Sequence, residues 1–456
     1  MKKILIAVLL VAVMAVPAFA SVQNIKVSGD LKTTWAVRGD FDLGKAASTL
    51  NQNDVLSYAR VRIDADLTDN VSATVRLLNE RTWGETWSAS DNNQEVDLDL
   101  AYVQLREMLY SPLTVTLGRQ ELFYGNGLII GGNGPNNSTV GPLIANGLKD
   151  LSMRNSLDAI KAVFNYDPLT VDMFLAVSNN NSTGPVGEDE TDDVNVYGVN
   201  ANYKLSDKWS TVAEGYFFAK IDNDSDATTN KKDTVYVPGF RVSTNPLKGL
   251  NVQGELAWQR GTDVYTGPLS HKREAMAAQF IASYLLPFTK TAKYEPVVAY
   301  AFTYASGDKD LNSSTGVDGG DAMKGWDPMF EHISGGKIYN AIMDLTNVYA
   351  NELSLTMKPV QDITTKLTWT MLTLDKKLTA STWTAPYGSN YYNVNTDKRT
   401  LGNEIDMDLT YAYTEDVSIG MSAGWFLPGK VFKDETGSLN NRKAATQLLT
   451  SMTVAF

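Results

Sequence analysis

The chain contains no cysteine among its 456 residues. Disulfide frameworks, thiolate metal sites and a lipid-anchor cysteine are therefore excluded. The absence suits a protein that crosses an oxidising compartment in an unfolded state, because no unwanted disulfide can form on the way. Histidine is scarce too, since His271 and His332 are the only two. A hydrolase with a histidine-centred triad would also need an activated serine, and none stands out in the sequence.

Long hydrophobic runs are missing after residue 20. A membrane-spanning helix needs about 20 consecutive apolar residues, so the mature chain is not an α-helical membrane protein. The amino terminus differs, because two lysines precede an apolar run from Ile4 to Val16, and Ala18-Phe19-Ala20 has the small-x-small form of a cleavage site. We therefore expect residues 1–20 to be a removed secretory signal peptide and residues 21–456 to form one mature domain.

An excess of basic residues is absent as well. Aspartate and glutamate number 52 against 40 lysines and arginines, which gives a formal net charge of −12. Nucleic acid is a poor partner for such a chain, because binding to phosphates depends on lysine and arginine. Much of the acidic excess lies between the expected strands, for example in the run 188–193.

What is present is an alternating segment at the carboxy terminus, from Leu448 to Phe456. Its even-numbered residues are mostly large and apolar, and the last of them is a terminal phenylalanine. Such a strand is typical of the end of a bacterial outer-membrane β-barrel. We expect Met452, Val454 and Phe456 to face lipid, and we expect Phe456 to be read by the barrel-assembly machinery.

The rest of the chain shows candidate strands separated by connections of two lengths. Eighteen segments read as strands: 25–38, 57–68, 71–83, 96–107, 113–123, 157–167, 169–179, 194–205, 209–221, 234–245, 249–261, 274–286, 295–307, 349–359, 363–376, 402–414, 417–428 and 445–456. Every second connection is mostly short and rich in turn residues, while the others are long, above all 124–156 and 308–348. This pattern predicts an all-β fold, a transmembrane antiparallel barrel of about 18 strands.

Alternation within the strands indicates which side chains line the lumen. In 58–67, for example, Ala59, Val61 and Ile63 share one face, whereas Arg60 and Arg62 lie on the other. A charge on the lipid face near the midplane costs about 2–4 kcal/mol, so the charged face should point inward. The same parity yields these pore-lining candidates: Arg60, Arg62, Arg76, Arg241, Lys366, Asp406 and Asp408, with Arg119, Glu121 and Arg154 as additions.

One segment breaks this rule. Regular alternation in 113–121 would place Arg119 and Glu121 on the lipid face together with Leu117. We expect a bulge at Gly118 that turns both charges inward, although the strand could instead have left the membrane by this point.

The inward arginines support two interpretations. Guanidinium groups form bidentate hydrogen bonds with carboxylates and phosphates, so the patch Arg60, Arg62 and Arg76 could guide an anionic or polyhydroxylated solute. The same arginines could instead pair with nearby acids and stiffen the wall, because acids are about as frequent as bases on the expected inner face. Asp406 and Asp408 could in principle act as a glycosidase pair, but neighbouring acids are common in channel walls.

The most specific string runs from Gly118 to Gly131 and reads Gly-Arg-Gln-Glu-Leu-Phe-Tyr-Gly-Asn-Gly-Leu-Ile-Ile-Gly. Together with the segments 326–332, 337–339, 402–406 and 424–429, it resembles the alginate-export family of outer-membrane porins. The resemblance implies a monomeric 18-stranded barrel with an arginine-rich lumen and loops that fold inward. The candidates for setting access in these loops are Tyr124, Asn126, Trp326, Asp327, Phe330, His332 and Lys337.

A weak calcium candidate remains. Asp222, Asp224 and Asp226 have the spacing of the first ligands of a calcium loop, but Ala227 replaces the turn glycine, and a solvated acidic loop tip is the favoured interpretation of the run. No cofactor is expected.

The sequence therefore predicts an outer-membrane channel of a Gram-negative bacterium that passes hydrophilic, saccharide or anionic solutes by diffusion. A general diffusion porin and a structural or adhesive barrel are the alternatives. The direction of transport stays open.

Overall fold

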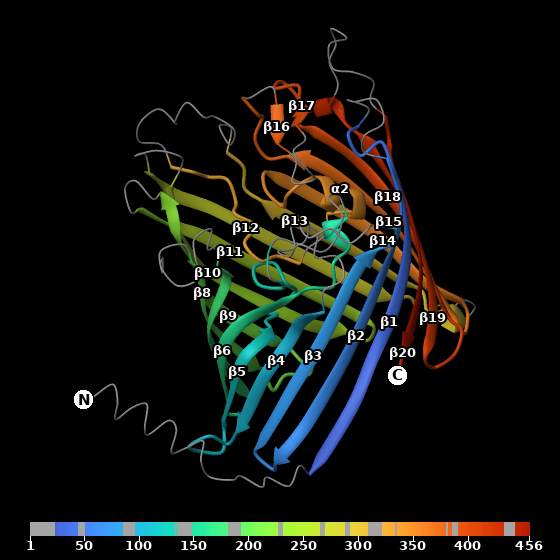
Figure 1. Ribbon diagram of the computed structural model, residues 1–456. Helices are drawn as coiled ribbons and strands as arrows, with labels where there is room; N and C mark the ends of the chain where they lie inside the picture. Colours follow the sequence, from blue (N-terminus) through green and yellow to red (C-terminus); the bar gives the residue numbers. More distant parts are fainter. Residues whose placement is uncertain are drawn as a thin grey trace.

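The computed structural model describes residues 23–43, 51–84, 96–132, 134, 148–180, 193–226, 231–264, 270–287, 292–308, 322–332, 335–379, 382–384, 391–432 and 443–456. The expected signal peptide, residues 1–20, lies outside this part of the chain. Within it, eighteen strands form a single antiparallel sheet that closes on itself. The predicted fold is therefore confirmed (Figure 1).

The barrel strands are β1 (Asn24–Gly39), β2 (Gln52–Thr68), β3 (Val71–Thr82), β4 (Asp97–Arg106), β5 (Leu113–Glu121), β6 (Ser156–Asn165), β7 (Leu169–Asn180), β8 (Asp193–Lys204), β9 (Val212–Asp226), β10 (Lys231–Leu247), β11 (Leu250–Val264), β12 (Ser270–Leu285), β13 (Val297–Ala305), β14 (Val348–Val360), β15 (Ile363–Leu374), β18 (Thr400–Ala412), β19 (Val417–Pro428) and β20 (Ala445–Ala455). A small hairpin, β16 (Thr382–Thr384) and β17 (Tyr391–Asn393), lies outside the barrel sheet. The helical elements are α2 (Lys337–Ile342) and the short turns η1 (Lys149–Leu151), η2 (Ala292–Tyr294) and η3 (Lys430–Phe432). Among the described helices, none combines the length and the apolar character that a membrane crossing requires.

The ring closes where the two ends of the chain meet. β1 pairs with β2 on one side and with β20 on the other, so Trp35 lies between Val55 and Thr450. At the end of this seam the backbone amide of Phe456 donates to the carbonyl of Gly29, and Gly29 donates back to Phe456, each at 2.9 Å. Closure leaves no unpaired strand edge, which is what a sheet in a membrane requires.

Connections alternate between the two ends of the barrel. The tight turns β2–β3, β10–β11 and β14–β15 lie at one end, which we call the short-turn end. The connections from β5 to β6 and from β13 to β14 lie at the other, the long-loop end, and part of each turns back into the ring, where α2 is visible (Figure 1).

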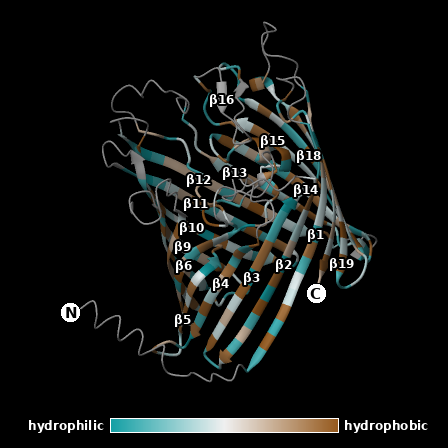
Figure 2. Cartoon of the chain, in the orientation of Figure 1, coloured by the Kyte–Doolittle hydropathy of each residue, from teal (hydrophilic) through white to brown (hydrophobic). Residues whose placement is uncertain are grey.

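The outer face of the barrel is apolar, as the alternation predicted. Val61 and Ile63 on β2 are about two-fifths exposed, and Met452 and Phe456 are exposed by 50% and 62%. Figure 2 shows the resulting alternation of hydrophobic and hydrophilic residues along the strands. Apolar side chains exposed along the outer face of a closed sheet suit an apolar solvent.

Three stretches of the long connections lie inside the ring, and we call them the first (122–132), second (148–155) and third (322–332) inner segments. The first and third are joined by a parallel bridge between Ile130 and Phe330. Backbone amides of Gly131 and Phe330 donate across this junction, at 2.7 and 3.2 Å. Leu122, Leu128, Ile129 and Ile130 belong to the largest buried cluster of the protein, together with side chains on the wall. The lumen is therefore partly filled by a second layer of chain.

The expected bulge at Gly118 is wrong. β5 keeps a continuous register against both β4 and β6, although Gly118 has φ +119° and a Cβ there would lie 2.2 Å from the carbonyl oxygen of Ala101. The irregularity lies on β4 instead, where Arg76 pairs with Leu100 and Leu77 with Leu98, which leaves Asp99 as the extra residue. A bulge on the neighbouring strand brings an acid inward without changing β5.

Candidate functional site

The basic residues predicted to line the pore all have carboxylate partners. The ion pairs are Arg60–Asp30 (2.8 Å), Arg62–Asp64 (2.8 Å), Arg76–Asp99 (2.5 Å), Arg76–Glu121 (2.5 Å), Arg119–Asp158 (3.0 Å), Arg154–Glu80 (3.3 Å), Arg154–Asp97, Arg241–Glu214 (2.5 Å) and Lys366–Glu352 (3.5 Å). Arg62 and Arg76 are direct neighbours across β2 and β3, so the basic patch exists. Its charge is balanced locally, which favours the structural interpretation of these arginines.

Arg119 points to the other side of the wall from the remaining candidates. It keeps the parity of Leu117, and its partner Asp158 shares a face with Ile160, which is 50% exposed on the outside of the barrel. Arg119 therefore belongs to the outer surface. Glu121, at the end of the same strand, instead reaches the inward Arg76.

The second inner segment is fixed to the wall by charge and by apolar contacts. Both Nη atoms of the buried Arg38 donate to Asp150, at 2.9 and 2.6 Å. Glu80 accepts hydrogen bonds from the hydroxyl of Ser152 and from the amide of Met153. The hydroxyl of Tyr58 donates to the carbonyl of Leu151 at 2.9 Å, next to a buried apolar cluster on β1 and β2. Paired, largely buried charges of this kind hold a segment in one position.

The first inner segment places Tyr124 and Asn126 against the wall. The ring of Tyr124 stacks on Phe174 of β7 and packs against Phe218 of β9, with centroids 5.4 Å apart in both pairs. The amide of Asn126 donates to Gln279, and its oxygen accepts from Arg241 at 3.1 Å. Both access candidates therefore serve as anchors in this structure.

In the third inner segment, Asp327 makes the main polar contact. Lys220 of β9 donates to its carboxylate at 2.6 Å, and Gln259 of β11 bonds both its backbone amide and its carbonyl. Burial alone would raise the pKa of Asp327, but attraction to Lys220 and Arg273 outweighs burial and keeps this pKa below its ordinary value of 3.8. A charged aspartate is therefore part of the anchor at neutral pH.

The remaining access candidates of this segment are held by packing. Trp326 and Phe330 are 2% and 3% exposed, within the largest buried cluster. The ring of His332 meets that of Phe123 edge to face at 6.1 Å, and its amide donates to the carbonyl of Gly127.

Helix α2 presses against β18 and β19. Its first turn is capped by a side chain of β18, because the carboxylate of Glu404 accepts hydrogen bonds from the amides of Ile338 and Tyr339 at 2.6 and 2.8 Å. The lysine that begins the helix, Lys337, bonds Asp408 and the hydroxyl of Ser422. Asp406 is 2% exposed and lies beneath the helix, so this predicted pore residue does not face open space.

Open space in the lumen lies beside Lys337. A cavity of about 230 Å³ is bounded by β18, β19, β20, β1 and β2, with Leu151 of the second inner segment opposite. Its polar lining consists of Lys32, Thr34, Asp408, Thr410, Ser422 and Ser451, together with the Tyr58 ring edge. Hydroxyl groups surround one cation, Lys32, and one carboxylate, Asp408, a set suited to a small solute that carries both hydroxyls and charge.

Lys32 was missed by the sequence reasoning. Its ammonium lies 5.7 Å from the ring centroid of Tyr58, and no described carboxylate lies within ion-pair distance of it. The nearby Asp30 pairs with Arg60 instead. Alternation on β1 would have placed Lys32 inward with Thr34. Its significance depends on the absence of a partner, which only the packing shows.

The calcium candidates do not form a loop. Asp222, Asp224 and Asp226 all lie on β9, in extended backbone that cannot wrap around an ion, and the side chains of the last two lie outside the described part. In the described residues no cluster of three potential metal ligands is present.

Solved structures with the same fold come from Pseudomonas aeruginosa. OpdK with vanillate is 9% identical, with a TM-score of 0.56 over 95% of this chain and 100% of that one. OccK2 with glucuronate is 12% identical, with a TM-score of 0.55 over 95% and 99%. OccD3 is 10% identical, with a TM-score of 0.55 over 95% and 92%. No curated protein matches the sequence.

The alginate export family profile matches residues 23–446, which is most of the chain. The predicted resemblance and the absence of enzymatic activity are thereby confirmed. With the closed barrel and its apolar outer face, the match places the chain in the bacterial outer membrane, in contact with lipid. The protein belongs to the alginate export family and is an outer-membrane channel for small solutes.

Proposed function

We propose that this channel passes small hydroxylated acids, such as sugar acids, and that they travel along the wall formed by β18, β19, β20, β1 and β2. The observation that carries the proposal is the cavity on this wall, with the unpaired cation Lys32 among hydroxyl groups. A carboxylate on the solute would bind the ammonium, and its hydroxyls would exchange water for Thr34, Ser422 and Ser451.

The predicted track along Arg60, Arg62 and Arg76 is not part of this proposal. Each of these guanidinium groups already has a carboxylate within 2.8 Å, so a passing anion would have to compete with a fixed acid. Lys32 offers its charge without that competition, and it is half-buried, which reduces screening by salt.

Two comparisons make carboxylates the first class to test. The family takes its name from the export of alginate, a polymer of sugar acids. The structurally similar OpdK and OccK2 are described with vanillate and glucuronate, both of which carry one carboxylate.

The test is ion current through single channels in planar bilayers, with glucuronate added. We expect wild-type current to show anion preference and to be blocked by glucuronate. Lys32→Gln should raise the half-blocking concentration about tenfold, which corresponds to about 1.4 kcal/mol. Lys366→Gln is the matched control, because Lys366 is an inward lysine that is already paired with Glu352. Equal block in wild type and Lys32→Gln would contradict the proposal.

A closed structural barrel is the second candidate. The observation in its favour is the interior itself, where Trp326, Phe330 and Tyr339 are nearly fully buried between the walls. The same recordings distinguish the two, since a structural barrel would show no ion current in wild type or in either lysine variant.

A further inference from the structure

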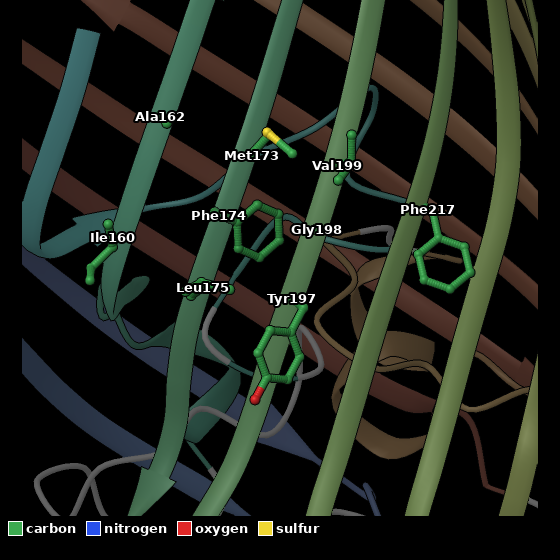
Figure 3. Close-up of a pocket in the computed structure, with 9 residues that line it drawn as sticks. All are labelled: Ile160, Ala162, Met173, Phe174, Leu175, Tyr197, Gly198, Val199 and Phe217. Atoms are coloured by element: carbon green, nitrogen blue, oxygen red, sulfur yellow. The ribbon is translucent and has the colours of Figure 1, made fainter. Parts of the chain in front are cut away.

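A groove lies on the outer face of the barrel, across β6, β7, β8 and β9 (Figure 3). It has a volume of about 320 Å³, and the side chains around it are almost entirely apolar. Ile160, Met173, Leu175, Tyr197, Val199 and Phe217 surround it, while Ala162 contributes only a methyl group.

The groove is closed toward the lumen. Phe174 and Gly198 are direct partners on β7 and β8, and the Phe174 ring lies so close to Gly198 that a Cβ there would be 2.0 Å from it. Phe174 is 3% exposed and belongs to the interior cluster. The backbone and this ring therefore form a floor, and whatever fills the groove must come from the membrane side.

A charged pair lies next to the groove, toward the long-loop end. On β6, Asp158 is two residues before Ile160 on the same face, and it pairs with Arg119 of β5 at 3.0 Å. The Arg119–Asp158 contact uses only Nη1 of the guanidinium. Nε is buried, and among the described residues Nη2 makes no hydrogen bond, so Nη2 is the donor left for a ligand. Charged groups on the lipid face are tolerated at the interface but not at the midplane, so this pair marks the level of the headgroups.

We infer that the groove is a binding site for one lipid of the extracellular leaflet, with an acyl chain in the groove and a phosphate at Arg119. The long loops of such barrels are extracellular, which puts the pair at the outer surface and the groove in the hydrocarbon layer directly beneath it. The occupant is a lipid because the surrounding solvent at this level is lipid. The phosphate follows from Nη2 of the partly exposed Arg119, since guanidinium N–H groups form strong charge-assisted hydrogen bonds with phosphate oxygens.

The test counts lipids bound to the purified full-length barrel in mild detergent by native mass spectrometry. Dimyristoyl phosphatidic acid is the phosphate-bearing probe, and dimyristoylglycerol is its neutral counterpart. Ala162→Phe fills the groove and should weaken binding of the first phosphatidic acid about tenfold. Ala278→Phe on β12 is the matched control, because Ala278 faces outward between Met276 and Phe280, away from the groove, and should bind like wild type.

Arg119→Gln tests the headgroup. It should weaken binding of phosphatidic acid about threefold and leave dimyristoylglycerol unchanged, because only the phosphate uses the guanidinium. Val199→Phe, on the opposite side of the groove, repeats the filling test should Ala162→Phe reduce folding. Equal binding by the groove-filling variants and the Ala278→Phe control would overturn the inference. An unchanged affinity of Arg119→Gln for phosphatidic acid would overturn the assignment of the phosphate.

Discussion

The inner wall of this barrel differs between two regions. On β6 to β10, the packed side, inward residues such as Phe174, Tyr216, Phe218 and Val237 are buried beneath the first and third inner segments. On β18, β19, β20, β1 and β2, the cavity side, helix α2 and the second inner segment cover part of the inner face, and the residues that border the remaining open space mostly carry hydroxyls or charges. Both regions obey the same alternation of faces. What differs is the neighbour of the inner face, which is packed protein on the packed side and partly open space on the cavity side.

This difference shows how a channel can be both rigid and open. An apolar inner face lets the inner segments pack as they would in a soluble core, with aromatic stacks such as Tyr124 on Phe174. The polar inner face opposite borders the cavity, and in the proposed function a solute travels along that side of the lumen.

The largest expected effect concerns the packed side. Phe218→Ala should lower the free energy of unfolding by about 4 kcal/mol, because it leaves a void between the wall and the first inner segment. Phe217→Ala, the adjacent residue, is the control, since its ring is 48% exposed on the outer face and lipid chains can replace it. Urea titrations of both variants in lipid vesicles measure the difference, and equal losses would show that the packed side is not a core.

A smaller effect is expected where the packed side is held by charge. Arg241 bonds Glu214 at 2.5 Å, Gln253 at 2.7 Å and Asn126. Arg241→Met leaves the buried Glu214 without its ion-pair partner and should lower the free energy of unfolding by about 3 kcal/mol. Arg60→Met should cost only about 1 kcal/mol, because the Arg60–Asp30 pair is about one-fifth exposed. Urea titrations in lipid vesicles measure both losses. A larger loss for Arg60→Met than for Arg241→Met would contradict this distinction between the regions.

The anchor of the third inner segment should respond to acid. Because the pKa of Asp327 in the folded protein lies below its unfolded value of 3.8, its pair with Lys220 is at full strength above that pH and is lost as pH falls below it. We expect the ion current to become noisier in that acidic range as the segment loosens, with an anchoring loss of about 1–2 kcal/mol. Asp327→Asn should show the noise already at neutral pH.

A wild-type channel that stays quiet through the whole acidic range in which the barrel remains folded, or an Asp327→Asn channel that is quiet at neutral pH, would contradict this role of the anchor. Asp327→Asn should also lose the response to acid, which separates this group from the many other carboxylates that titrate in the same range.

The smallest effect is expected at Lys366. Its Nζ lies 3.5 Å from Glu352, and its side chain is 42% exposed, so Lys366→Gln should change the free energy of unfolding by less than about 0.5 kcal/mol. A larger loss in urea titrations would mean that even open parts of the wall depend on charge pairing.

Much of the fold could be predicted from the sequence. The eighteen strands, their pairing order and the lipid-facing side of β2 and β20 followed from alternation and turn spacing. In the segment 157–167 the sequence leaves the inner face ambiguous, because Leu157 and Ala159 are apolar on the inner face while Ile160 is apolar on the outer face. That ambiguity was itself a sign of the packed side, since a strand covered on both faces shows no alternation.

The candidate site was less predictable. Parity placed Arg60, Arg62 and Arg76 inward and allowed them to pair with nearby acids, but it could not decide between that pairing and a patch open to a solute. Arg119 was misplaced because the bulge that moves an acid inward lies on β4, where the sequence shows no glycine or proline. Lys32 was overlooked because it resembles any other inward polar residue.

The sequence alone was therefore sufficient to establish that the outer face contacts lipid, how many strands form the barrel and at which end the long loops lie. These properties depend on neighbours along the chain and on a lipid environment that acts alike on every strand. The folding of the inner segments, the balance of charge in the lumen and the place of the cavity depend on side chains far apart in sequence. The pairs Arg38–Asp150 and Lys220–Asp327 join residues that only the closed ring brings together, so no local sequence pattern predicts them.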